Sequence, residues 1–190
     1  MSLKLITPPT ALAGELADAK LQLRVTSSAE DSLITLLIGA ATQAAEHELG
    51  RALLTQTWEL IIDAFPVAEI KLPKPKALAI TTVAYLDEAG DEQTLAGSAY
   101  SLDADKLPGW LFPADGTSWP ATADVANAVR VRFTAGYGAS AASVPENVRL
   151  WILMHVSTAY RMREAAASGT VSEIPGRFFP SLLDSERVYA

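Results

Sequence analysis

The chain has 190 residues, 49% of them hydrophobic and 19% charged, so it can bury the core of one compact domain. Its formal net charge of -7 argues against a surface that binds nucleic acid throughout, because neutralising phosphates takes clustered Lys and Arg. It contains no cysteine for disulfides or thiolate metal sites, no signal-peptide pattern, and no apolar run of the roughly 18 residues that a membrane-spanning helix needs. We therefore expect a soluble protein made in the cytoplasm, without membrane contact.

The chain begins with a segment that cannot be helical, followed by a short amphipathic helix. The Pro8-Pro9 pair makes residues 3–9 an extended lead-in or a short edge strand. Thr10 is then the expected cap of a helix over residues 11–23, despite Gly14. Its apolar side is formed at helical spacing by Leu12, Leu16, Ala19 and Leu23.

The next segment, residues 27–58, predicts the main helix of the fold. Ser27 and Glu30 have the spacing of a capping box, so the helix should begin near Ser28, and Gly50 supplies the left-handed residue that ends it. The connector before it is short, which favours an antiparallel hairpin with the first helix. The expected apolar stripe consists of Leu33, Leu37, Ala41, Ala44 and Ala45, with Ile34, Ile38 and Leu49 beside it.

After Gly50 the pattern changes to that of β-strands. Strands are predicted over residues 55–65, 69–72 and 79–87, and three in succession imply a meander. A further strand, 92–95, should form a hairpin with 79–87 around Gly90. Shorter strands are expected at 100–102, 109–112 and 129–134, the last with one buried and one solvated face. Residues 113–127 form the expected loop, held by Trp119.

The third large helix should start at Pro145 and end at Gly169. Its stripe of Val148, Ile152 and Val156 is expected to pack on the N-terminal hairpin. These patterns predict an α+β chain, residues 1–190, forming a single domain. The helical core comes from an N-terminal helical hairpin, 1–54, and a long C-terminal helix, 143–168, with a β-rich insertion, 55–138, between the second and third helices. Residues 169–190 are expected to be a flexible C-terminal tail.

No group of residues favours catalysis. The two histidines, His47 and His155, lack the partners that a metal site needs. Gly136 and Gly138 resemble part of a phosphate-binding loop, but no helix follows directly, so a tight turn is the plainer interpretation. We assign no catalytic, cofactor-binding or metal-binding residue and expect neither an enzyme nor a cofactor.

Two features could instead bind a protein partner. Arg161 and Arg163 lie near the end of the third helix, where a solvated face that suits the helix dipole is the competing explanation. The apolar side chains of the tail are too few to make a core and must either fold back on the domain or bury against a neighbour; we favour the neighbour. The expected partner-binding residues are Arg161, Arg163, Phe178, Phe179, Leu182 and Leu183.

The order of several motifs resembles the head-tail connector, or adaptor, proteins of long-tailed bacteriophages and prophages, often labelled DNA-packaging proteins. The resemblance covers Leu5 to about Leu183. The motifs that carry it are Gly50-Arg51 with Leu54-Thr55-Gln56-Thr57-Trp58, then Thr134-Ala135-Gly136-Tyr137-Gly138, then Pro145 with Tyr160, Arg163 and Glu164.

The resemblance implies a structural phage protein that joins the portal vertex of the head to the tail. Copies would form a ring, possibly only on the portal protein, and the ring would extend the DNA channel and dock a tail-completion protein. DNA would pass through without being specifically bound. The protein would reside in the bacterial host cytoplasm during assembly and then in the virion, at the head-tail junction.

Two other classes remain open. One is an enzyme or small-ligand protein that uses the β region as a pocket, lined by Trp58, Tyr85, Trp110, Trp119 and Tyr137. The other is a DNA-packaging factor that binds DNA through a local basic patch, formed by Lys71, Lys74, Lys76, Arg130 and Arg132.

Overall fold

The computed structural model describes residues 1–162 and 181–188 and contains two compact units. The first, here called the β unit, combines Met1–Pro9 with Thr55–Tyr137. The second, here called the helical unit, combines Thr10–Leu54 with the described residues from Gly138 onward. The fold class is α+β, as predicted. No helix within the described ranges is long and apolar enough to span a membrane.

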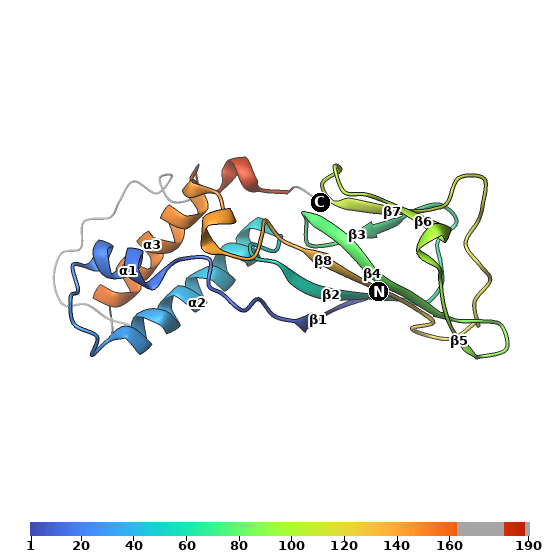
Figure 1. Ribbon diagram of the computed structural model, residues 1–190, viewed down its shortest axis with the longest axis horizontal. Coiled ribbons are helices and arrows are strands. Elements are labelled where there is room, and N and C mark those ends of the chain that lie inside the picture. The colour runs from blue at the N-terminus through green and yellow to red at the C-terminus, as the bar shows by residue number, and fades with distance from the viewer. Residues whose placement is uncertain (163–180, 189–190) are drawn as a thin grey trace. The chain divides into compact units, whose positions relative to one another are not determined.

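The helical unit contains three α-helices that all contact one another: α1 (Leu16–Leu23), α2 (Asp31–Leu49) and α3 (Glu146–Arg161) (Figure 1). Short 3-10 helices lie at Ala141–Ser143 and Asp184–Glu186. Gly14 precedes α1 rather than weakening it, and a Cβ at this glycine would lie 3.3 Å from methyl groups of both Ile38 and Ile152. The fully buried core side chains include Ile34, Ile38, Ala45, Leu49, Val148 and Ile152.

The helix starts differ from the predicted ones. The helix expected over 11–23 begins only at Leu16, and α2 begins at Asp31 with Glu30 in the cap position. Ser27 does not form the capping box, because its Oγ accepts a hydrogen bond from the nearby Ala29 N–H instead. The end of α2 is as predicted, with Gly50 in the left-handed conformation at φ 67°.

The buried face of α2 is also rotated from the expected stripe. Ile34, Ile38 and Ala45 are fully buried, whereas Leu37 is half-buried and Ala44 is exposed. The spacing of apolar residues correctly predicted an amphipathic helix, but the predicted buried face was centred on the row of residues next to the observed one.

The β unit holds two antiparallel sheets (Figure 1). The five-stranded sheet has the order β1-β2-β8-β4-β5, and the three-stranded sheet has the order β3-β7-β6. A single 3-10 turn, Gly97–Ala99, precedes β6. The strands are β1 (Ser2–Thr7), β2 (Gln56–Ile62), β3 (Ile70–Leu72), β4 (Ala77–Leu86), β5 (Glu92–Thr94), β6 (Tyr100–Asp103), β7 (Gly109–Pro113) and β8 (Val129–Ala135).

The predicted meander is wrong, because β2, β3 and β4 are not sequential neighbours in one sheet. β2 pairs with β1 and β8, while β3 pairs with β7 in the other sheet. The strand order also corrects the boundary of the helical core, expected to include residues 1–54. Met1–Pro9 lies in the β unit, since β1 forms an edge strand along β2.

Three local predictions for this unit are confirmed. β4 and β5 form the hairpin around Gly90. Along β8, buried Val129, Val131 and Phe133 alternate with half-buried neighbours. Trp119 holds its loop by donating a hydrogen bond from Nε1 to the Ala68 carbonyl at 2.7 Å.

Candidate functional site

The structure describes three of the six predicted partner-binding residues. Arg163, Phe178 and Phe179 lie outside the described residues. Arg161 is the last residue of α3 and is exposed. Leu182 is half-buried, and Leu183 is only 1% exposed.

Residues 181–188 pack against the helical unit through specific contacts. Asn147 Nδ2 donates hydrogen bonds to the Leu182 carbonyl at 2.7 Å and to Ser185 Oγ at 3.1 Å. Arg187 NH2 lies 3.5 Å from Glu48 Oε2. Together with the burial of Leu183, these contacts correct the expectation of a flexible tail over this part of 169–190. Here the chain folds back on its own unit.

A further contact of this segment involves a buried arginine. Arg51 is 4% exposed, and its NH1 donates to the Glu186 carbonyl at 2.8 Å and lies 3.0 Å from Glu186 Oε2. A buried guanidinium needs such a partner, because leaving the charge unpaired would cost several kcal/mol, about 3–5. The sequence analysis identified Arg51 only as part of a motif. Nothing in the sequence predicted that it would pair with Glu186, 135 positions later.

One exposed hollow of the helical unit, of about 680 Å³, contains Arg161. We call it the arginine hollow and define it by Leu21, Gln22, Arg24, Leu153 and Arg161, with Asp18 at its side. Leu21 is 80% exposed there. Neither arginine has an ion-pair partner among residues 1–162 and 181–188. Arg24 was not singled out from the sequence, because nothing in the pattern marks it as the residue that ends α1.

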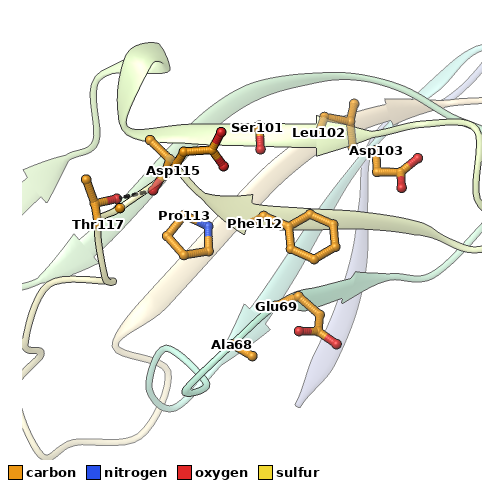
Figure 2. A pocket seen from close by; sticks show the side chains of 11 residues that line it. Ala68, Glu69, Ser101, Leu102, Asp103, Phe112, Pro113, Asp115 and Thr117 are labelled. Carbon is orange, nitrogen blue, oxygen red and sulfur yellow. Dashed lines mark hydrogen bonds between the residues drawn. The ribbon is translucent and has the colours of Figure 1, made fainter.

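The β unit has its own open groove, of about 550 Å³, on the three-stranded sheet (Figure 2). We call it the acidic groove and define it by Glu69, Ser101, Asp103, Phe112 and Asp115. Figure 2 shows the three carboxylates around the Phe112 ring and Pro113. No aromatic residue of the predicted ligand pocket lines this groove, so the expected aromatic lining is wrong for it.

Two residues that line the acidic groove contact a lysine of the same chain. Lys106 Nζ lies 3.3 Å from Asp103 Oδ2 and 5.2 Å from the centroid of the Phe112 ring. Desolvation opposes ionisation of Asp103, but hydrogen bonds and the charge of Lys106 outweigh it and lower the pKa of that carboxyl. Glu69 and Asp115 have no hydrogen-bond or ion-pair partner for their carboxylates within the described residues.

The two histidines have different surroundings. His47 is exposed on α2. The His155 ring stacks on Trp151 with centroids 3.6 Å apart, and burial lowers its pKa, against the opposing effects of the Trp151 carbonyl and Glu48. Within residues 1–162 and 181–188, no three His, Cys, Asp or Glu side chains are grouped as a metal site requires.

The cations of the predicted basic patch are partly neutralised. Arg132 NH2 lies 2.7 Å from Glu59 Oε2, and Arg130 forms an ion pair with Glu92. Paired arginines release fewer counterions on binding DNA than free ones. This weakens the interpretation as a DNA-binding surface.

Comparison with known proteins agrees with the motifs in the sequence. Residues 14–88 match the family model of phage gp6-like head-tail connector proteins. This match confirms the predicted resemblance over these residues, which include the first of the three motifs. It runs through α1, α2, β2, β3 and β4, and so through parts of both units. No curated protein matches the sequence.

Solved structures with a similar fold come from gene transfer agent (GTA) particles. Two of them, from the neck of an empty GTA particle computed with C6 symmetry and from the virion of a native GTA particle, each have a TM-score of 0.82. A third, from the neck of a native GTA particle computed with C12 symmetry, has a TM-score of 0.77. Each is 22% identical to this chain, and the alignment covers 100% of this chain and 97% of that chain. At this identity the likeness establishes a shared fold.

Proposed function

We propose that this protein is a structural component of a phage-like head-tail junction. The observation that carries the proposal is the connector-family match over residues 14–88, in a chain whose whole fold resembles chains of GTA necks and virions. A structural role of this kind requires packing surfaces and no catalytic residue. The protein would act in the virion after assembly in the cytoplasm of a bacterial host.

In this proposal, copies of the chain form a ring on the portal protein and extend the channel through which DNA passes. The C6 and C12 symmetries of the related neck structures support a ring, because cyclic symmetry repeats one contact around an axis. A net charge of -7 suits a channel that lets DNA pass without holding it. The far side of the ring would dock a tail-completion protein.

Within each copy, the helical unit would serve as the scaffold. Its three helices come from both ends of the chain, and residues 181–188 close it through Leu183 and the buried Arg51–Glu186 pair. The β unit would then present its sheets and loops to neighbours. This division would let the surface of the β unit vary between relatives without weakening the scaffold.

Deleting the gene from a phage or prophage that carries it tests the proposed role. Electron microscopy of the lysate should show DNA-filled heads and free tails, and a plasmid copy of the gene should restore joined particles. Normal particles without the gene would overturn the proposal. Heads that remain empty of DNA would favour the packaging factor instead.

A titration with duplex DNA at several salt concentrations provides an independent test. The purified protein should bind weakly and with a shallow dependence of log K on log salt, because Arg130 and Arg132 are already paired. A steep slope, removed by replacing Lys71, Lys74 and Lys76 with Ala, would support the basic patch as a DNA-binding surface.

Light scattering over a concentration series examines the ring itself. We expect mostly monomer in dilute solution and a ring at high concentration or on addition of the portal protein, since assembly follows mass action. A tight ring at the lowest concentration would show that the portal is not needed for closure.

A further inference from the structure

We propose that the acidic groove of one copy receives the arginine hollow of the next copy, which makes these two surfaces the contact between neighbouring subunits. The inference rests on the proposed ring and specifies how it closes. It follows from three properties of the described residues: unpaired charge on both surfaces, an apolar centre in both, and an arginine kept at a costly backbone position.

The acidic groove has the composition of a receptor for a guanidinium group. Glu69 and Asp115 are available as acceptors, since neither carboxylate is engaged within the described part of the chain. Phe112 offers a ring face against which a planar cation can stack. Lys106 lies close to both Asp103 and the Phe112 ring, so two of the lining residues already contact a cation.

The arginine hollow carries the complementary groups. Arg24 and Arg161 come from the C-terminal ends of α1 and α3 and line the same hollow. Leu21 is 80% exposed in it, so an apolar side chain lies beside the two cations. Bidentate pairing of arginine with a carboxylate is strong and directional, and an adjacent apolar contact excludes water from it.

Arg24 is held at a position where the fold alone would favour another residue. It ends α1 in the left-handed conformation, with φ 57° and its N–H donating to the Leu21 carbonyl at 3.2 Å. Glycine or asparagine is the usual residue there, because a longer side chain adds strain. An arginine at this position is therefore better explained by what its side chain binds than by the turn it makes.

The occupant of the groove is a second copy because the two complementary surfaces belong to the same chain. They are different surfaces, so each copy can give its arginine hollow to one neighbour and its acidic groove to the other. Such head-to-tail contacts close into a ring when the rotation between copies permits. Opposite charges would also favour the correct orientation during encounter.

The absence of cysteine allows a direct test by disulfide trapping. Ser101→Cys places a thiol in the acidic groove and Gln22→Cys places one in the arginine hollow, and both positions are exposed. The two single-cysteine proteins are purified separately, mixed at high concentration and oxidised. A covalent dimer of the two proteins should form at least about tenfold faster than with Ala89→Cys, an exposed control at the β4–β5 hairpin, in place of Ser101→Cys.

Charge reversal tests the chemistry of the contact. Glu69→Lys with Asp115→Lys, or Arg24→Glu with Arg161→Glu, should each reduce the trapping rate to that of the control. Combining one reversed acidic groove with one reversed arginine hollow should restore it. High salt should slow trapping between the native surfaces, because the Debye length falls to about 3 Å at 1 M. Circular dichroism confirms that each variant is folded.

Equal trapping of Ser101→Cys and the Ala89→Cys control overturns this inference, and so does charge reversal without effect. If light scattering under the same conditions still shows a ring, the ring closes through another contact and only this inference fails. If the Ser101→Cys and Gln22→Cys proteins do not trap each other and the wild-type protein forms no ring even on the portal protein, the proposed ring fails with it.

Discussion

The two units of this protein are stabilised in different ways. In the helical unit, residues far apart in the sequence meet at single buried points, such as Leu183 in the core and Arg51 with Glu186. In the β unit, neighbouring strands pair along their length, and cross-strand ion pairs such as Arg132 with Glu59 lie on the face opposite the buried valines. The helical unit thus includes contacts between segments that are distant in the sequence, whereas the β unit distributes its contacts over paired strands.

This difference bears on function because residues 181–188, far along the sequence from α1 and α2, pack into the helical unit. Residues 181–188 supply Leu183 and Glu186 to the unit that contains α1, α2 and α3. Single substitutions should therefore act most strongly in the helical unit.

The largest effect is expected from Ile38→Asp, which places an unpaired carboxylate in the fully buried centre of α2. We expect a loss of more than about 4 kcal/mol in the free energy of unfolding, and little soluble protein. Leu36→Asp is the matched control on the same helix, because Leu36 is 68% exposed, and should change stability by less than about 0.5 kcal/mol. Urea unfolding followed by circular dichroism measures both; similar values for the two would contradict the observed face of α2.

Leu183→Ala should have the next largest effect, at about 2–4 kcal/mol, because it leaves a cavity where a fully buried leucine packed. The half-buried Leu182 in the same segment provides the control, and Leu182→Ala should cost distinctly less. The same urea unfolding experiment measures the loss of stability in both variants. A small loss for Leu183→Ala, no greater than that for Leu182→Ala, would mean that residues 181–188 contribute little to the core and would return them to the role of a docking segment.

The sequence predicted the helices better than the sheets for a physical reason. Helical hydrogen bonds are local, so the spacing of apolar residues and the glycine at Gly50 were sufficient to place α2 within a few residues. Strand pairing is not local, and nothing within residues 55–72 indicates that β2 pairs with β8 while β3 joins another sheet. The hairpin of β4 and β5 was predictable because its turn is local.

The candidate surfaces were predictable only in part. Arg161 was identified from its place near a helix end, but Arg24 became visible only through its left-handed conformation. The acidic groove was missed because Glu69, Asp103 and Asp115 are separated in the sequence and are brought together by the pairing of β3 and β6 with β7. The connector resemblance, by contrast, depended on the order of local motifs and was confirmed over residues 14–88.

A smaller loss of stability is expected from a substitution at Gly138, in the turn after β8. A Cβ at Gly138 would lie 2.6 Å from the Ser143 Cβ, which is closer than real side chains approach. Gly138→Ala should therefore cost about 1–2 kcal/mol, and adding Ser143→Gly should recover most of that loss. Gly97→Ala in the β unit is the control, because no atom lies within 4 Å of the added methyl group. Failure of Ser143→Gly to rescue would place the strain elsewhere.

The smallest effect is a pH dependence that arises from His155 in α3. Burial lowers the pKa of His155 below its ordinary value of 6.5, so the unfolded chain binds this proton more readily than the folded one. The neutral imidazole therefore favours the folded state above pH 6.5, and this contribution is lost as pH falls through 6.5 and levels off below the folded pKa.

The stability of the wild type relative to His155→Gln should accordingly remain constant well above pH 6.5 and fall as the pH drops through 6.5, until it levels off below the folded pKa. Comparing the two proteins at each pH removes the contribution of the carboxylates, which titrate in both. NMR titration of the His155 ring gives its folded pKa directly. A relative stability that rises on acidification would mean that the Trp151 carbonyl and the charge of Glu48 together outweigh burial at this histidine.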